Sequence, residues 1–311
     1  MNIIGKRYWF FALSLLIIIP GMIILATSGF PLAIDFKGGS LLELEFVKGT
    51  VPSTEEVVAT YSSLDINDVQ VQNAKSKDGL DNILFIRSPF ISDEVKLQIV
   101  SKLEEAAPGA EIRVNRFDSV GPVIAGQVTR RAAIAVGIAA LAVVIYIIWA
   151  FRGIAHAFRY GICAILAMLH DILIVFSVTA IGSKLWGWQM DSLFLTALLT
   201  VIGFSVQDKI VVFDRIRENS ALLRRLPFET LVNHSIVQTL QRSINTQLMT
   251  VEFMLLSLAL LGGVTLREFA VILMIGLLSG TYSSIFIAAP LLVVWENQEW
   301  KTWFKKQPAN A

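Results

Sequence analysis

The chain has 311 residues, of which 55% are hydrophobic and 16% are charged, and this composition excludes an ordinary water-soluble globule. Its single cysteine, Cys163, excludes a disulfide framework and a cysteine-based zinc site. The net charge of +1 divides unevenly: residues 30–122 carry −6 and the remainder carries +7, so the two regions are expected to face different surroundings, and the acidic one argues against a nucleic-acid partner.

The first predicted element is a membrane-spanning helix within residues 1–29, where an apolar run begins near Trp9. A cleaved signal peptide is the alternative, because Lys6 and Arg7 precede the run and Ala26-Thr27-Ser28 loosely resembles a cleavage site. The run is long for the core of a signal peptide, so a retained helix is favoured.

Residues 30–122 change to the periodicity of a water-soluble α+β domain. Alternating apolar and polar residues predict four strands, at 40–47, 69–73, 82–88 and 111–117. One helix is predicted after a Ser53 or Thr54 cap, and a second begins at Ser92 and ends before Pro108. The resulting order β-α-β-β-α-β is that of the ferredoxin-like unit.

Five further spans are expected in residues 123–296, followed by a tail at 297–311. They lie near residues 131–150, 160–182, 192–214, 240–262 and 268–294. Six crossings place both termini on one side, and most basic residues near the span ends collect there, which indicates the cytoplasmic side. The predicted fold class is an α-helical polytopic membrane protein with six transmembrane helices and one inserted ferredoxin-like α+β extracytoplasmic domain.

Ionisable residues inside the predicted spans are candidates for function, because a charge at mid-bilayer costs roughly 2.5 to 3.5 kcal/mol on insertion scales. Asp208 in the fourth span lies roughly 9 Å below Asp214 at the inner boundary. Arg242 enters the fifth span from the same side, so Asp208 and Arg242 are expected to meet and to pair.

Other charged groups lie nearby in the predicted spans. His170 and Asp171 in the third span form either a second relay station or a buried hydrogen-bonded pair. Lys209 is expected to extend its ammonium to the inner interface rather than to take part. Glu252 has no predicted role.

Polar side chains around Asp208 and Arg242 predict a hydrated seam between the fourth and fifth spans. The seam residues are Gln207, Gln238, Asn245 and Thr246. Two interpretations stay open: a static bridge that locks two helices together, or a proton relay, since a poorly solvated carboxylate beside a cation can take up and release a proton as that cation moves.

No enzyme activity, cofactor or metal is predicted, because phosphate-loop, zinc-protease and nucleophile-elbow patterns are absent from the sequence. Asp171 and Asp208 could in principle form a proteolytic dyad. Gln207 argues against this, because intramembrane aspartyl proteases carry a glycine at that position.

An ordered set of motifs resembles the SecF members of the SecD/SecF family of protein-export membrane proteins. The most specific segment is LTVIGFSVQDKIVVFDRIREN, residues 199–219. The others are Asp35-Phe36-Lys37-Gly38-Gly39, Ser119 to Pro122, Leu169-His170-Asp171, Gln238 to Ser243 and Gly280 to Ser284. Asp35, Gly38 and Gly39 open the exported domain, and the set covers nearly the whole chain.

The resemblance implies a subunit that pairs with SecD to complete a transporter of the resistance-nodulation-division kind in the cytoplasmic (inner) membrane. It implies that the pair assists the SecYEG channel, with YajC and YidC as further candidate partners and unfolded preprotein as substrate. In this family a proton flow moves the exported domains, and the family's intramembrane Asp and Arg correspond to Asp208 and Arg242. Lys209 departs from the pattern, since a small hydroxyl residue is common there.

Two other hypotheses are carried forward. An exporter of small molecules or lipids from the wider superfamily is disfavoured, because such exporters usually have about twelve spans from an internal duplication that this sequence lacks. A passive scaffold that only stabilises its partners would need neither Asp208 nor Arg242.

Overall fold

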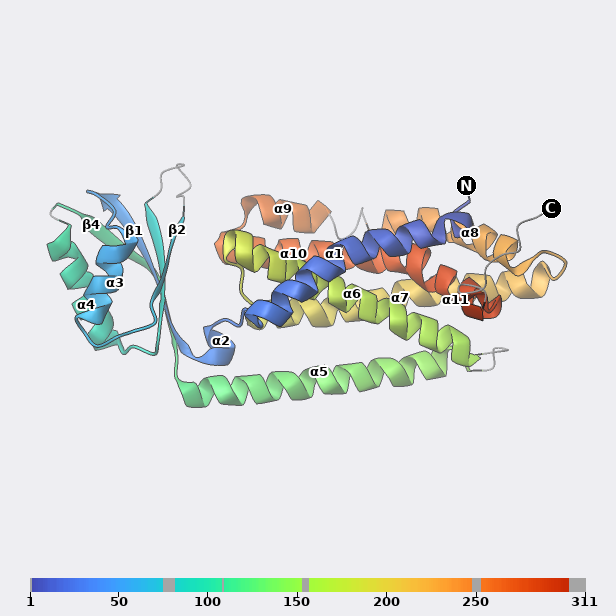
Figure 1. The fold of residues 1–311 in the computed structure, drawn as a ribbon, viewed down its shortest axis with the longest axis horizontal. Helices are drawn as coiled ribbons and strands as arrows, with labels where there is room; N and C mark the ends of the chain where they lie inside the picture. The colour runs from blue at the N-terminus through green and yellow to red at the C-terminus, as the bar shows by residue number, and fades with distance from the viewer. Residues whose placement is uncertain (1, 75–81, 108, 153–156, 248–252, 302–311) are drawn as a thin grey trace. The chain divides into compact units, whose positions relative to one another are not determined.

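The computed structural model describes residues 2–74, 82–107, 109–152, 157–247 and 253–301 (Figure 1). The chain divides into two compact units. One unit is Leu32–Ile134, which overlaps the predicted exported segment, and the other combines Met1–Pro31 with Ala135–Ala311.

The smaller unit is built around one four-stranded antiparallel sheet, with strand order β2-β3-β1-β4. Its elements in chain order are α2 (Ile34–Lys37), β1 (Gly39–Lys48), α3 (Thr54–Ser62), β2 (Gln70–Ala74), β3 (Ile83–Ser88), α4 (Asp93–Ala106) and β4 (Glu111–Val120). Both α3 and α4 cover the same face of the sheet (Figure 1). The predicted four strands, two helices and their order are confirmed.

Local sequence signals explain why the two helices of this unit begin where they do. The Ser53 hydroxyl accepts from the backbone N–H of Glu56 at 3.3 Å, and the Ser53 N–H donates to the Glu56 carboxylate at 2.8 Å, which completes a capping box. Ser92 caps α4 through the N–H of Val95 at 3.4 Å. The apolar faces of these helices and of β1 and β3 then share one core. Its fully buried members include Leu42, Leu44, Val57, Tyr61, Leu84, Ile86, Ile99 and Leu103.

Five helices among the described residues are long and apolar enough to cross a membrane. They are Ile4–Ser28, Pro122–Ala150, Ala157–Trp186, Ser192–Leu222 and Leu266–Glu296. They correspond to α1 (Arg7–Ser28, after a short turn), α5, α6, α7 and the run from α10 (Val264–Ser283) to α11 (Ala289–Glu296). These five coincide with five of the six predicted spans.

The remaining predicted span, near 240–262, is described only in part. Helix α8 (Phe228–Gln247) begins before the predicted span and mixes apolar and polar residues along its length, and α9 (Phe253–Leu261) covers the apolar end of that span. Residues 248–252, and with them Glu252, lie outside the described residues. A continuous sixth crossing therefore stays a prediction.

The last span contains a π-helical turn at Ser284–Ala288 between α10 and α11. Pro290 stands at the start of α11 and lacks the N–H that a regular helix would use. A π-helical turn is one way in which a helix accommodates such an interruption, and it frequently marks a functional site.

The first and the last described residues lie at the same end of the helical unit (Figure 1). Arg7, at the start of α1, forms an ion pair with Glu299 at 2.6 Å and another with Glu229 of α8 at 3.2 Å. The Asn233 side chain of α8 accepts from the backbone N–H of Ile3 at 2.8 Å. These contacts tie the chain's beginning, α8 and the segment after α11 to one another.

Glycines let the helices of this unit approach closely. Gly276 of α10 packs against Val201 of α7, where an added Cβ would lie 2.3 Å from a valine methyl. Gly280 packs against Ser205, where an added Cβ would lie 3.4 Å from the Ser205 Cα, so the two glycines form a small-xxx-small contact surface. Gly21 of α1 lies against Ser177 of α6, whose Cα would be 2.3 Å from an added Cβ.

Gly21→Ala is expected to lower the free energy of unfolding by about 1–3 kcal/mol, because α1 and α6 must separate to admit the methyl group. The measurement is unfolding of the full chain in mixed detergent micelles. Gly137→Ala in α5 is the matched control, since an added Cβ there meets nothing within 4 Å and alanine is the better helix former. Equal stability of the two variants would contradict the close α1–α6 packing.

Candidate functional site

A buried ion pair joins the third and fourth predicted spans. The Lys209 ammonium of α7 lies 2.7 Å from Asp171 Oδ2 of α6, and the two side chains are 0% and 1% exposed. The expectation that Lys209 extends to the interface is therefore wrong. Lys209 stays buried because the Asp171 carboxylate within its reach compensates its charge. Only a lysine without such a partner needs to extend its ammonium to the interface.

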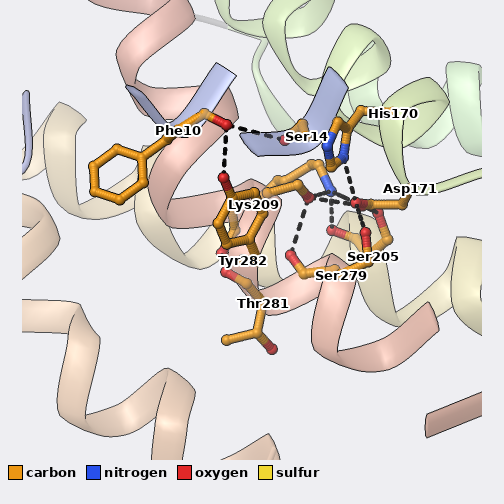
Figure 2. Close-up of polar contacts among 12 residues, drawn as sticks. Phe10, Ser14, His170, Asp171, Ser205, Lys209, Ser279, Thr281 and Tyr282 are labelled. Carbon is orange, nitrogen blue, oxygen red and sulfur yellow. Dashed lines mark hydrogen bonds and ion pairs between the residues drawn. The ribbon is translucent and has the colours of Figure 1, made fainter. Parts of the chain in front are cut away.

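Serine hydroxyls complete the surroundings of this pair (Figure 2). Asp171 Oδ2 accepts from Ser205 at 2.6 Å and from Ser283 at 2.7 Å, and Asp171 Oδ1 accepts from Ser279 at 2.8 Å. Ser205 and Lys209 are four residues apart on α7, and Ser279 and Ser283 are four apart on α10, so each pair shares one helical face. Three helices thereby converge on one carboxylate.

His170 connects this cluster to the first helix. Its Nδ1 lies 3.0 Å from Asp171 Oδ1, and its ring stacks on Tyr282 with 6.1 Å between ring centroids. The Tyr282 hydroxyl donates to the carbonyl of Phe10 in α1 at 2.8 Å (Figure 2). The geometry favours the buried hydrogen-bonded pair for His170 and Asp171, and a relay role for them stays a prediction.

Asp208 occupies the neighbouring position on α7 and turns away from this cluster. It is half-buried and accepts from the Thr281 hydroxyl of α10 at 3.0 Å. Adjacent residues of a helix point in directions about 100° apart, so Asp208 and Lys209 meet different environments. Thr281 is the one hydrogen-bond donor to Asp208 among the described residues.

The expected ion pair between Asp208 and Arg242 is not formed in this structure, in which both residues are described. Arg242 is exposed on α8. Within the described ranges, no lysine, arginine or histidine side chain forms an ion pair with the Asp208 carboxylate. The predicted fifth span was a single apolar helix starting at Arg242. Instead α8 starts at Phe228, and its Ser235 and Gln238 accept hydrogen bonds from Asn219 near the end of α7.

Polar contacts join α7 and α8 near Asn219, and they include one of the predicted seam residues, Gln238. Gln238 accepts from Arg215 at 2.6 Å and from Asn219 at 2.9 Å, and Asn219 also donates to the buried Ser235 at 2.8 Å. The other predicted seam residues do not join it. Gln207, Asn245 and Thr246 are exposed.

The Asp35, Gly38 and Gly39 motif forms the entry to β1. Gly38 and Gly39 have φ angles of 79° and 122°, which side chains with a Cβ rarely adopt. An added Cβ on Gly39 would also lie 2.7 Å from the Ser88 carbonyl oxygen of β3. The two glycines are therefore required by the turn that follows α2, and Asp35 lies within α2.

The serines and Tyr282 were not predicted as partners of the buried charges. A signal was present, since Ser205 with Lys209 and Ser279 with Ser283 repeat a four-residue spacing inside apolar helices. The pairing of Lys209 with Asp171 could not be deduced from that spacing, because it depends on the rotation of α6, α7 and α10 about their axes.

The fold and the buried charges define a multi-pass membrane protein with ionised groups held inside its helical bundle. Residues 98–298 match the model of the family described as "Protein export membrane protein SecD/SecF, C-terminal", and residues 23–50 match "SecD/SecF GG Motif". The chain belongs to the SecD/SecF family.

Two relatives are similar in sequence to the whole length of the chain. It is 62% identical to the protein translocase subunit SecF of Anaerolinea thermophila and covers 100% of both proteins. It is 43% identical to SecF of Thermobaculum terrenum, covering 100% of this chain and 99% of that protein.

A solved structure has a similar fold. The crystal structure of SecDF from Thermus thermophilus, a translocon-associated membrane protein, superposes with a TM-score of 0.80 at 31% identity. The match covers 96% of this chain and 39% of the SecDF chain, so this chain corresponds to one part of a longer protein there.

Proposed function

We propose that this chain is an auxiliary subunit of the preprotein translocase, which uses the proton-motive force together with SecD to complete export through SecYEG. The observation that carries the proposal is identity of 62% over the whole length of a SecF translocase subunit. The chain acts as a transporter subunit and not as an enzyme. The membrane is the cytoplasmic (inner) membrane, with both termini in the cytoplasm.

Partnership with SecD is supported by two observations. The Thermus thermophilus relative is named SecDF, and the region similar to this chain makes up 39% of its length. The rest of that protein is long enough to hold a SecD-like part. Within this chain, only 6% of the residues in the most apolar stretch of α5 are buried, although this helix is rich in alanine. A second membrane subunit is the natural cover for such a helix. YajC and YidC are further candidate partners.

The proposed exported domain is the segment 30–122, with a ferredoxin-like fold. The element order β-α-β-β-α-β and the strand order β2-β3-β1-β4 support this fold. The bundle has six spans in this proposal, with the fifth formed from α8, α9 and the residues between them. The contact of Arg7 with Glu299 places the start of α1 and the segment after α11 at the same end of the bundle. An even number of crossings, such as six, has this consequence.

The proposed proton carrier is Asp208. Asp171 is held by Lys209, His170 and three serines, whereas Asp208 has one hydrogen-bond donor, Thr281, among the described residues and is half-buried. In the proposed cycle, ionised Asp208 attracts Arg242, and protonation removes that attraction. The resulting shift of α7 relative to α8 biases the exported domain between two orientations, which pulls on preprotein and limits its back-sliding.

The test is export into proteoliposomes that contain SecYEG, SecD and this chain, with a preprotein trapped part-way. An imposed proton gradient is expected to increase the completed fraction only when both SecD and this chain are present. A gradient effect without this chain would contradict the proposal. Efflux of a small apolar dye driven by the same gradient, with no effect on preprotein, would favour the alternative of a resistance-nodulation-division exporter.

A further inference from the structure

The Lys209 ammonium is enclosed by oxygen atoms in the manner of a bound ion. Four oxygens lie around Nζ: Asp171 Oδ2 at 2.7 Å, Ser205 Oγ at 2.6 Å, Ser283 Oγ at 2.9 Å and the Ser205 carbonyl at 3.2 Å. They come from α6, α7 and α10, so the cage is set by the packing of three helices. Figure 2 shows Lys209 reaching into this ring of polar atoms.

An ammonium has three N–H donors, but four oxygens converge on it here. The four oxygens therefore surround Nζ as a coordination shell surrounds an ion. Three directed hydrogen bonds would account for only three of them. An ammonium group and a potassium ion are similar in size, so the same oxygens can surround either one.

The charge of the cage selects a monovalent cation. Among the residues that the structure describes, Asp171 supplies the one carboxylate in contact with Nζ, and the other oxygens belong to neutral groups. A divalent ion would leave a net positive charge in a buried site, which is costly.

We propose that Lys209 is a tethered cation that permanently fills a monovalent-cation site formed by Asp171, Ser205 and Ser283. Shortening the side chain to alanine opens this site to a free potassium or ammonium ion. The Lys209 ammonium thereby keeps free ions out of the centre of the bundle and keeps Asp171 paired. The cage is a property of these three helices and does not depend on the role of the chain in export.

The experiment compares the thermal unfolding of purified full-length Lys209→Ala in potassium, ammonium and choline chloride at equal ionic strength. Potassium and ammonium are expected to raise its unfolding temperature by roughly 5 °C over choline at about 100 times Kd. Choline is too large for the cage. The unaltered chain is expected to unfold at the same temperature in all three salts, because its own ammonium occupies the site.

Three variants make the test specific. Lys209→Met fills the space with an apolar chain and is expected to show no preference among the salts. Asp171→Asn in the Lys209→Ala background removes the carboxylate and is expected to abolish the response. Lys184→Ala, at an exposed position on α6, is the control for the loss of a lysine and is expected to behave like the unaltered chain.

Two results would overturn the proposal. One is an unfolding temperature of Lys209→Ala that is the same in potassium and in choline, or a potassium response that persists without the Asp171 carboxylate. The other is failure of Lys209→Ala to accumulate as folded protein when it is made and purified in potassium, since the free ion should then replace the missing ammonium.

Discussion

Asp208→Asn is expected to reduce proton-gradient-dependent completion of export by about tenfold or more, to the level seen without the chain. Asparagine has nearly the shape of aspartate and can still accept from Thr281, which donates to Asp208 at 3.0 Å. It cannot take up or release a proton. The variant therefore removes the proposed step and leaves packing of α7 against α10 in place. The measurement is the completed fraction of a trapped preprotein in proteoliposomes, with and without an imposed gradient.

Asp214→Asn is the matched control for that experiment. Asp214 lies on the same helix, is 57% exposed in its side chain and pairs with Arg217 at 2.6 Å, so its loss is expected to leave the gradient effect unchanged. A full gradient effect in Asp208→Asn would show that the proton passes elsewhere. Intact export after loss of both Asp208 and Arg242 would favour the passive scaffold.

Asp171→Asn is expected to lower the free energy of unfolding by about 3–5 kcal/mol, the largest stability effect predicted for this chain. The substitution leaves the fully buried Lys209 ammonium without its counter-charge, and the cost of that unpaired charge exceeds the value of the lost contact. Unfolding of the full-length chain in mixed detergent micelles measures the effect.

The double variant Asp171→Asn/Lys209→Met separates charge from packing. Both charges are then absent, so much of the stability lost in Asp171→Asn is expected to return. Asp214→Asn serves again as the comparison, because the exposed ion pair with Arg217 is expected to contribute only about 0–1 kcal/mol. A double variant as unstable as the single one would contradict the view that an unpaired buried charge causes the loss.

The smaller unit, Leu32–Ile134, was largely predictable because its signals are local. The capping box of Ser53 and Glu56 and the cap at Ser92 fix the helix starts within a few residues, and alternation over two-residue periods marks the strands. Their sequence order then leaves few ways to build one sheet. Five membrane helices were predictable for a similar reason, since a long apolar run is itself the requirement for crossing a bilayer.

The candidate site was predictable only in part. The charged residues were identified because charges are rare inside apolar helices, and Asp171, Asp208 and Lys209 all stand out for that reason. The predicted contact of His170 with Asp171 is present, but the partners of Asp208 and Lys209 were assigned incorrectly. Asp208 was expected to pair with Arg242 and Lys209 to reach the interface, whereas Lys209 pairs with Asp171 and Asp208 meets Thr281.

The sequence by itself determined which segments are apolar, where helices and strands begin, and which ionisable residues lie among apolar neighbours, because each of these depends on residues close together in the chain. Only the tertiary structure decided which charges neutralise one another. That choice depends on how α6, α7 and α10 are rotated and how closely Gly276 and Gly280 let them approach. A rotation of α7 by about 100°, one residue, would point Asp208 in the direction that Lys209 now takes, and no local pattern specifies that rotation.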